Sequence, residues 1–482
     1  MTTTSARRVS AALASEFQGR LLTPGDEDYD RQRTVWNAMV DRRPAVIAVC
    51  SSTRDVVRAV NAARAEGLPL SVRGGGHSVS GHALRDGGLA IDLSGMRRVT
   101  VHADRGRVDA EGGCLLADLD RATGPHGLVV PAGTVSETGL GGLALGGGTG
   151  WLTRSYGLTC DNIDSCEVVL ADGRVVETCS VTRPNLFWAL RGGGGNFGVV
   201  TRFTLRAHRF GPDMRVAVSL YRPEEAPEAL AAYSALAPGL PRTIGWHASL
   251  KKRLPPYPFV PADRVGEPGL LLIAMWLGEA DDPAATRLRH LTRVGTPYAQ
   301  EDVVLPFVDG VQRLMDAEFP DGRRYYTKET HLRALEPEAV AEITRFWSDM
   351  PMDGEIVFLL LGGALRDVPE GESAFSRRGS PWWLQLLLHW QDPRCDRLYA
   401  QQAREAVGRL GASRAPGAYL NMRNADEDGD VRTLVEAYGG PGKYARLRAV
   451  KALYDPDNVF RTNWNIAPAG PGGRAGDGSD PA

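Results

Sequence analysis

The 482-residue sequence has no long hydrophobic run and no excess of charge of either sign. Its longest apolar stretches, residues 270–277 and 356–361, are far too short to cross a bilayer, so we expect no membrane association. There are 56 lysines and arginines against 58 aspartates and glutamates, and this balance speaks against a nucleic-acid partner. The first residues contain no continuous apolar segment, which predicts that there is no signal peptide.

Cysteine is also scarce, with six residues in the whole chain. They form no Cys-x-x-Cys pair and show no zinc-ligand spacing, so no metal site is expected. Scattered cysteines in a chain of this length are typical of reduced thiols, which predicts a cytoplasmic protein. The length itself exceeds what one hydrophobic core supports, so two or three domains are expected.

Glycine, in contrast, is abundant, and many of the 56 glycines lie between residues 74 and 198. The first cluster is Arg73-Gly74-Gly75-Gly76-His77-Ser78, which follows the short apolar segment 68–72. Glycine lets a ligand approach the backbone closely, and successive N–H groups in such a turn can bind an anion. An imidazole beside this turn can act as a nucleophile, a base or a ligand. We therefore place the functional site here.

Two further glycine blocks follow, at residues 131–150 and 191–198. The second block contains Gly139-x-Gly141-x-x-Ala144, which formally matches the dinucleotide-binding fingerprint, with Asp161 about twenty residues further on. That fingerprint should follow a buried strand, however, and here a Pro-Ala-Gly turn and polar residues precede it. A Rossmann domain is therefore not the preferred interpretation.

Hydrophobic spacing predicts a mixture of helices and strands, the α+β class. Helical spacing occurs at residues 53–66, 115–122, 224–236, 284–291, 337–350, 398–410 and 444–454. Short apolar runs predict strands at residues 68–72, 199–205, 216–220, 270–277, 356–361 and 384–390.

Several motifs together resemble the FAD-linked oxidases of the berberine-bridge-enzyme type, within the vanillyl-alcohol-oxidase superfamily. They occur in the family's order at both ends of the chain. The matching segments are RGGGHSVSG (73–81), the glycine block from Pro131 to Trp151, YGLTCDNI (156–163), ADGRVV (171–176), LFWALRGGGGNFGVVT (186–201) and YDPDNVFR (454–461).

The resemblance implies an α+β fold with a two-subdomain FAD-binding domain of the PCMH type and a substrate domain built on an antiparallel sheet with helices. It predicts an N-terminal helical lead-in at 1–42, the FAD-binding domain at 43–209 and the substrate-binding domain at 210–416. A C-terminal segment at 417–468 is expected to return to the FAD domain. The composition of 469–482 predicts a disordered tail.

The resemblance also implies that His77 is bonded covalently to the 8α carbon of FAD, with the turn Gly74–Ser78 at the pyrophosphate. The other residues expected to contact FAD are Arg73, Gly74, Gly75, Gly76, Ser78, Pro131, Gly133, Thr134, Thr138, Gly139, Gly142, Gly147, Gly148, Asn162, Ile163, Val199 and Asn465. The second histidine of this stretch, His82, is expected to be structural.

The chain departs from the family pattern at the second flavin attachment. Many relatives use a cysteine in the second glycine block, and Val135 occupies the matching position. A single bond through His77 is therefore expected. Cys160 lies beyond that block, and we expect it to be a buried free thiol.

The chain also differs from the family pattern at the position of the catalytic base. Plant-type relatives have a tyrosine where this chain has Met422, and a thioether cannot accept a proton as a base. Tyr419 is retained in the same motif and is the predicted substitute. The other candidates, among which the sequence does not decide, are Tyr325, Tyr326, His331 and His389.

The resemblance thus implies an FAD-dependent oxidase that removes hydride from a small organic substrate and is reoxidised by O2. One alternative is an oxidative cyclase or oxygenase acting on an intermediate of secondary metabolism, since the hydroxyl of Thr138 lies where many relatives have Val or Leu. Another is a flavin-binding protein that has lost activity. The sequence does not indicate the oligomeric state.

Overall fold

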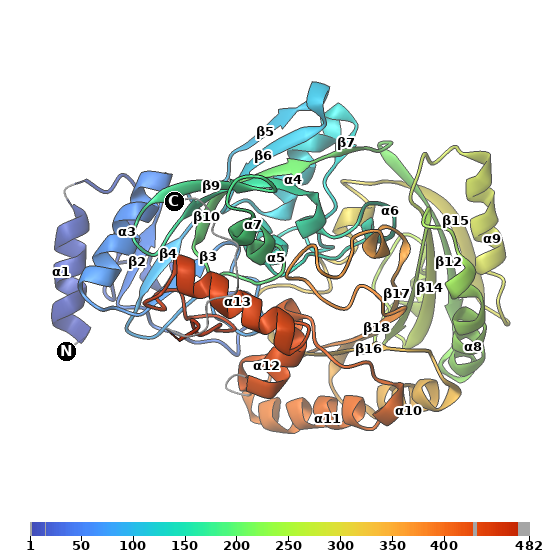
Figure 1. Cartoon of the computed structure of the whole chain (residues 1–482). Coiled ribbons are helices and arrows are strands. Elements are labelled where there is room, and N and C mark those ends of the chain that lie inside the picture. Colours follow the sequence, from blue (N-terminus) through green and yellow to red (C-terminus); the bar gives the residue numbers. More distant parts are fainter. Residues whose placement is uncertain (1, 15, 428–430, 471–482) are drawn as a thin grey trace.

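The first 209 residues build three small sheets, which lie in the blue to green part of Figure 1. The computed structural model describes residues 2–14, 16–427 and 431–470. A four-stranded sheet has the order β1-β2-β4-β3, with β2 and β3 parallel to β4. A five-stranded antiparallel sheet has the order β5-β6-β10-β8-β9, and β11 pairs with β7. The strands are β1 Arg20–Leu22, β2 Val46–Val49, β3 Leu70–Arg73, β4 Leu89–Asp92, β5 Val99–His102, β6 Arg107–Glu111, β7 Leu128–Val129, β8 Ile163–Val169, β9 Val175–Cys179, β10 Val199–Arg206 and β11 His208–Arg209.

Helices cover these sheets, and α3 shows why they form where they do. Ser52 caps α3 by accepting a hydrogen bond from the Asp55 backbone N–H. Val56, Val60 and Ala63 recur at helical spacing on one buried face, which packs in the same core as the four-stranded sheet. The helices of this part are α1 Thr2–Ala14, α2 Tyr29–Gln32, α3 Thr53–Ala65, α4 Leu116–Thr123, α5 Leu140–Leu145, α6 Thr153–Tyr156 and α7 Pro184–Leu190.

The middle of the chain forms one seven-stranded antiparallel sheet, on the right of Figure 1. Its order is β15-β12-β14-β13-β17-β18-β16. The strands are β12 Asp213–Tyr221, β13 Ile244–Lys251, β14 Gly269–Trp276, β15 Ala299–Pro306, β16 Arg324–Leu332, β17 Asp353–Leu360 and β18 Trp382–Trp390.

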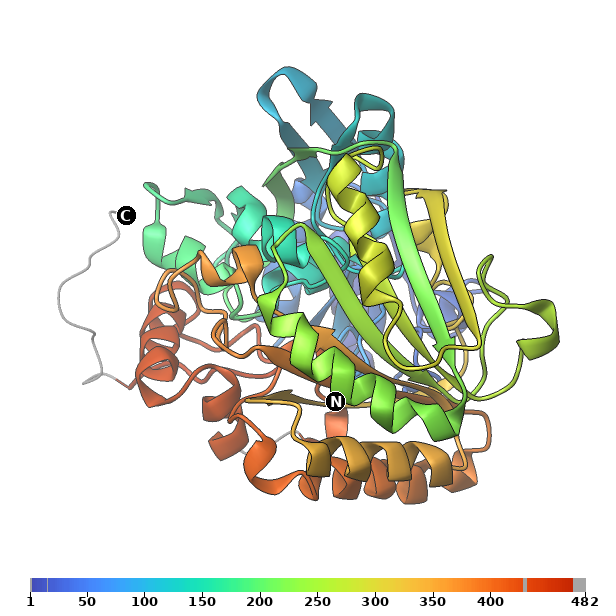
Figure 2. The ribbon, with the colours of Figure 1, turned by 90° about the vertical axis from the view of Figure 1, so that its right-hand side faces the viewer.

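The two faces of this sheet have different roles, as β13 shows. Trp246, Ala248 and Leu250 belong to the hydrophobic core that also holds residues of three helices, α8 Ala226–Leu236, α10 Pro337–Asp349 and α11 Asp396–Gly408. Figure 2 shows these helices along one face of the sheet. Alternate residues of a strand point to opposite faces, so His247 and Lys251 lie on the other face, toward the glycine-rich half.

The C-terminal segment returns to the first half through α12 Val431–Ala437 and α13 Pro441–Tyr454 (Figure 1). Helix α13 packs against α7, and its Leu447 and Val450 share a core with Leu186 and Phe197. This path brings the residues after α13 beside the third glycine block.

The expected α+β fold with an antiparallel substrate-side sheet is confirmed. The region predicted as a helix at 284–291 is a 3₁₀ segment, Pro283–Arg287, followed by the short helix α9 Leu288–Leu291. The segment predicted as a helical lead-in also contributes β1, which pairs with β2. Strands β13, β15 and β16 were not predicted, because polar residues interrupt their apolar runs. The polar residues alternate with apolar ones in β13 and are consecutive in β15 (300–302) and β16 (327–331).

The domain boundaries themselves remain predictions. Most of the tail predicted to be disordered, from 471 on, lies outside the described residues. Within the described part of the chain, no helix combines the length and the apolar character needed to cross a bilayer.

Candidate active site

A cavity of about 440 Å³ lies between the glycine-rich half, the seven-stranded sheet and the C-terminal segment. All three glycine blocks contribute to its wall. The predicted site residues that line it are Gly74, Gly75, Gly76, His77, Ser78, Gly133, Thr134, Thr138, Gly139, Gly142, Val199 and Tyr419. Segments that are far apart in the sequence thus meet at one place.

His77 is held in this wall as a neutral imidazole with one free nitrogen. Its ring stacks on Trp36, with centroids 4.2 Å apart and planes 17° from parallel. Burial lowers the pKa of His77 to about 4. Its Nε2 is buried and has no hydrogen-bond partner among the described residues. A neutral, unpaired ring nitrogen at a cavity is available for bonding to a ligand.

The glycines of the wall serve two purposes. Gly75 and Gly139 join the first two blocks, since a Cβ at Gly75 would lie 2.4 Å from the Gly139 nitrogen. Gly142 and Gly195 also line the cavity, but a Cβ at either position would meet nothing within 4 Å among the described atoms. The first pair therefore allows backbones to pack, and the second leaves open space beside the wall.

Seven predicted cofactor residues do not line the cavity. They are Arg73, Pro131, Gly147, Gly148, Asn162, Ile163 and Asn465. Arg73 is directed elsewhere, since it donates to the Gln32 carbonyl and lies 3.7 Å from the buried carboxylate of Asp92. Asn162 donates to the carbonyls of Tyr156 and Leu158.

In the C-terminal segment, Asn463 and Trp464 line the cavity, whereas Asn465 does not. Asn463 donates through Nδ2 to the Gly195 carbonyl at 3.0 Å, and its Oδ1 is buried with no partner in the described part of the chain. The asparagine that lines the cavity is thus Asn463, two residues before the predicted Asn465.

Known proteins are similar to this chain in sequence and in fold. A family described as "FAD binding domain" matches residues 44–179, and one described as "Berberine and berberine like" matches residues 418–467. The (R)-6-hydroxynicotine oxidase of Paenarthrobacter nicotinovorans is 32% identical, over 96% of this chain and 100% of the relative. An uncharacterised FAD-linked oxidoreductase of Bacillus subtilis is 31% identical, over 94% and 98% of the two chains.

The chain belongs to the berberine-bridge-enzyme-like FAD-linked oxidoreductases. It is an FAD-dependent oxidoreductase. The solved structure of 6-hydroxy-D-nicotine oxidase from Arthrobacter nicotinovorans superposes with a TM-score of 0.80 at 28% identity, covering 94% of this chain and 99% of the other. Glucooligosaccharide oxidase from Acremonium strictum shares the fold, with a TM-score of 0.81 at 24% identity over 96% and 99% of the chains.

The cavity of this FAD-linked oxidoreductase fits its cofactor. The Nε2 of His77, which has no partner among the described residues, is open to a ligand, and the open positions beside Gly142 and Gly195 leave room along the glycine wall. His77, Gly74–Gly76 and Ser78 would hold FAD at the first block, with Gly142 at the second and Gly195 and Asn463 at the third.

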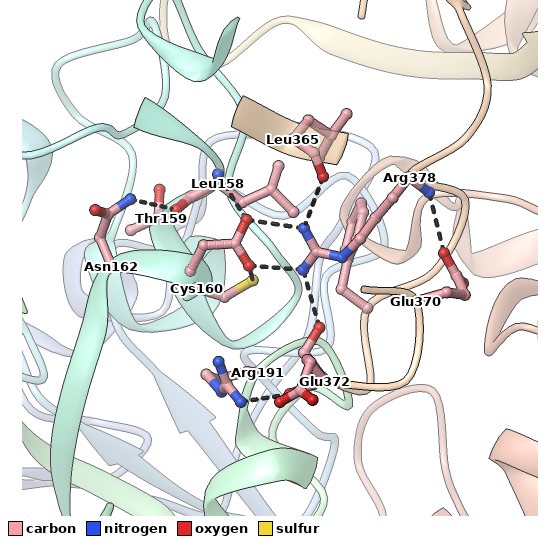
Figure 3. A network of polar contacts seen from close by, with 12 residues as sticks. Leu158, Thr159, Cys160, Asn162, Arg191, Leu365, Glu370, Glu372 and Arg378 are labelled. Atoms are coloured by element: carbon pink, nitrogen blue, oxygen red, sulfur yellow. Dashed lines mark hydrogen bonds and ion pairs between the residues drawn. The ribbon is translucent and has the colours of Figure 1, made fainter. Parts of the chain in front are cut away.

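Cys160 lies away from this wall. Its sulfur is 3.7 Å from Oδ1 of Asp161, whose carboxylate accepts two hydrogen bonds from Arg378, at 2.6 and 2.9 Å. Figure 3 shows Cys160 within this polar network. Burial raises the pKa of the thiol well above its usual value. All six cysteines are free, as predicted, and none lines the cavity among the described residues, whereas Val135 does.

Tyr419, the predicted base, has its hydroxyl engaged in the second glycine block. The phenol oxygen accepts hydrogen bonds from the Gly148 N–H at 2.8 Å and from Nδ2 of Asn421 at 2.9 Å. Burial raises its pKa despite these two donors. The geometry gives Tyr419 a part in holding the block.

Of the other candidate bases, only Tyr325 lines the cavity. Tyr325 lines the cavity, but its hydroxyl donates to the Pro320 carbonyl at 2.6 Å, and its ring stacks on Trp36. Tyr326 lies on the helix-covered face, where its hydroxyl contacts Asp426. His331 and His389 are buried but do not line this cavity.

The sequence analysis missed a group of charged residues in the part of the cavity wall that the seven-stranded sheet forms. Lys251 on β13 and Glu355 on β17 are opposite each other in the strand register, and both line the cavity. The signal available was polar residues at every second position of an otherwise apolar strand, His247, Ser249 and Lys251. Trp36 was missed because it lies in the segment predicted as a lead-in.

Proposed function

We propose that this FAD-dependent oxidoreductase is an oxidase that removes hydride from a small organic substrate and holds its flavin through one covalent bond at His77. The observation that carries the proposal is the neutral imidazole of His77, whose buried Nε2 has no partner among the described residues. We place the bond to the 8α carbon at this nitrogen. When bound, FAD supplies the two-electron acceptor, and O2 then takes the electrons to give hydrogen peroxide.

A single attachment is supported by the composition of the wall. The glucooligosaccharide oxidase of Acremonium strictum is described as having a 6-S-cysteinyl, 8α-N1-histidyl FAD, which is attached through two residues. In this chain Val135 lines the cavity, and no cysteine does among the described residues.

The free state of all six cysteines supports a cytoplasmic location.

The linkage is tested by acid precipitation of the purified yellow protein. Wild-type protein should retain flavin in the precipitate, and a tryptic flavopeptide should contain His77. The variant His77→Ala should bind FAD but release it in acid and oxidise substrate slowly. His82→Ala is the matched control, since His82 also lines the cavity but is hydrogen-bonded to Ser80. Release of flavin from the wild type contradicts the covalent bond.

The oxidase activity is tested by anaerobic bleaching of the flavin with benzyl alcohols, cellobiose and 6-hydroxynicotine. The last compound is chosen because a relative is named for it. A panel that leaves the flavin oxidised contradicts the oxidase and favours a flavin-binding protein without activity.

An oxygenase or oxidative cyclase is the second candidate, because Thr138, whose side chain carries a hydroxyl, lines the cavity. Isotopically labelled O2 separates the two: an oxidase releases the label as peroxide, and an oxygenase transfers it to the product. A cyclase is recognised by its ring-closed product.

A further inference from the structure

Glu355 presents one unpaired carboxylate oxygen in the cavity wall. The residue is 2% exposed, and its Oε1 is buried without a hydrogen-bond partner among the described residues. Its other oxygen, Oε2, accepts hydrogen bonds from Lys251 Nζ at 2.5 Å and from Ser249 Oγ at 2.6 Å. The carboxylate is thus fixed at one oxygen and free at the other.

Lys251 connects this carboxylate to a second one nearer the surface. Its Nζ also donates to Glu318 Oε2 at 2.6 Å, and the Tyr257 hydroxyl donates to Glu318 Oε1. The Glu318 side chain is 14% exposed, compared with 3% for Glu355. The residue before it, Ala317, is exposed. The hydrogen bonds therefore run from the cavity toward solvent.

We propose that Glu355 is the catalytic base of the reductive half-reaction and that Lys251 and Glu318 relay the proton outward. The substrate carries a hydroxyl or amine on the carbon that is oxidised. As that carbon gives hydride to FAD, Glu355 Oε1 takes the proton of the O–H or N–H, and a C=O or C=N bond forms. This role rests on the proposed oxidase function.

The surroundings of Glu355 support a proton relay. The titratable groups that face it are Lys251 and Glu318, with Tyr257 beyond Glu318 and His389 acting on it at longer range. One lysine stands between the buried carboxylate of Glu355 and the partly buried carboxylate of Glu318, and desolvation raises the pKa of Glu318 to about 7. Burial opposes the charge of Lys251, but the two carboxylates outweigh it and raise the pKa of the ammonium. A proton can therefore reside on Glu318 near neutral pH while Lys251 stays charged.

The decisive experiment compares Glu355→Gln with wild type by stopped-flow flavin reduction, using the panel compound that bleaches the wild type fastest. Glutamine preserves the shape and one acceptor oxygen but cannot take the proton. The limiting reduction rate should fall about 100-fold or more. The substrate Kd should change by less than about threefold. The matched control is Glu301→Gln, an exposed carboxylate on β15, which should reduce at the wild-type rate.

Each outcome decides the role. A wild-type limiting rate in Glu355→Gln overturns the proposal, and so does a weaker Kd with an unchanged rate, which would make Glu355 a substrate anchor. Equal flavin content in all variants shows that each is folded. Ser249→Ala removes one donor to Oε2 but keeps the carboxylate, so its rate should fall far less than that of Glu355→Gln.

The relay is tested without substrate, so it can fail separately from the oxidase function. Infrared difference spectra of the wild-type holoenzyme, recorded between about pH 5 and about pH 9, should show loss of a carboxylic acid band as Glu318 ionises. Part of the band should disappear in Glu318→Gln, whereas Glu301→Gln should keep the wild-type band. Buried Glu329 and Asp120, whose pKa values burial raises to about 7 and about 6, contribute equally to all three spectra. A band in Glu318→Gln equal to that of the wild type contradicts the relay even if the flavin is reduced normally.

Discussion

His77 and Tyr419 both lie in the cavity wall, but their neighbours leave them different chemistry. The Nε2 of His77 has no hydrogen-bond partner within the described ranges, and one ring face is covered by Trp36. The Tyr419 oxygen already accepts two hydrogen bonds. Burial keeps both groups neutral, since it lowers the pKa of the imidazole and raises that of the phenol. At the scale of single residues, the hydrogen-bond partners decide which neutral group can react.

The pKa of His77 predicts how flavin attachment depends on pH. Its folded pKa of about 4 lies below the ordinary value of 6.5, so the imidazole stays neutral until the pH falls near 4. Mixing apoprotein with FAD should give acid-stable flavin at a constant rate between about pH 6 and about pH 8. An ordinary histidine would lose about half of its neutral form near pH 6.5.

The same depressed pKa has a consequence for stability. Unfolded His77 takes up a proton as the pH falls through 6.5, whereas the folded residue does so only near pH 4. The apoprotein should therefore lose stability as the pH falls through this range. Circular dichroism at each pH separates slow attachment from loss of fold, and a rate that halves near pH 6.5 in folded protein contradicts the assignment.

Strand β13 shows what a single element contributes. Its residues alternate between the helix-covered core, where Trp246 and Ala248 are buried, and the cavity, where Ser249 and Lys251 lie. Its register with β17 places Lys251 opposite Glu355. A shift by one residue would exchange the two faces, so the strand pairing itself positions the charged group.

The turn at Leu420–Met422 is a second element that positions the site. Tyr419 precedes it and accepts the Gly148 N–H, while Asn421 donates to the Leu143 carbonyl at 3.1 Å. Tyr419→Phe removes an acceptor from a buried N–H, and we expect it to lower the free energy of unfolding by about 1 to 3 kcal/mol. Thermal unfolding measures this loss.

The limiting rate at which substrate reduces the flavin of Tyr419→Phe shows whether Tyr419 also acts as a base. A tyrosine that only holds the glycine block should leave the limiting rate within about tenfold of the wild type. A fall of 100-fold or more at unchanged stability would instead identify Tyr419 as the base, with about the contribution that general bases make.

At the scale of the whole molecule, one buried arginine joins the two halves. Arg154 on α6 donates to four carbonyls on the substrate side, those of Leu240, Pro241, Ile244 and Leu361. Burial lowers its pKa to about 10, so it stays charged at neutral pH. The wall of the cavity needs both halves, and this side chain fixes their contact.

Arg154→Met should destabilise the protein by at least about 3 kcal/mol, because four carbonyls each lose one donor. Thermal and denaturant unfolding measure the effect, and flavin affinity should weaken as the cavity opens. Arg242→Met is the control, since Arg242 forms an exposed ion pair with Asp367 and its loss should change stability much less. Equal effects in the two variants contradict the joining role of Arg154.

Much of the cofactor side could be predicted from the sequence because its determinants are local. The turn Gly74–Ser78 and the glycines of the second block are contiguous, and they line the cavity as expected, apart from Gly147 and Gly148. Among the other exceptions, Arg73 bonds to the Gln32 carbonyl, which lies outside its motif, whereas Asn162 bonds to the carbonyls of Tyr156 and Leu158 within its own motif.

The proposed base could not be predicted, because its surroundings come from distant parts of the chain. Lys251, Glu318 and Glu355 are separated by up to about one hundred residues and meet through strand register and a loop. Trp36 reaches His77 from the segment predicted as a lead-in. The sequence alone determined the cofactor, the family and the proposed attachment residue, since glycine turns and a neighbouring histidine act through local backbone geometry. Tertiary structure decided which polar groups share the cavity and which are satisfied elsewhere, because burial and hydrogen bonding depend on residues brought together only by folding.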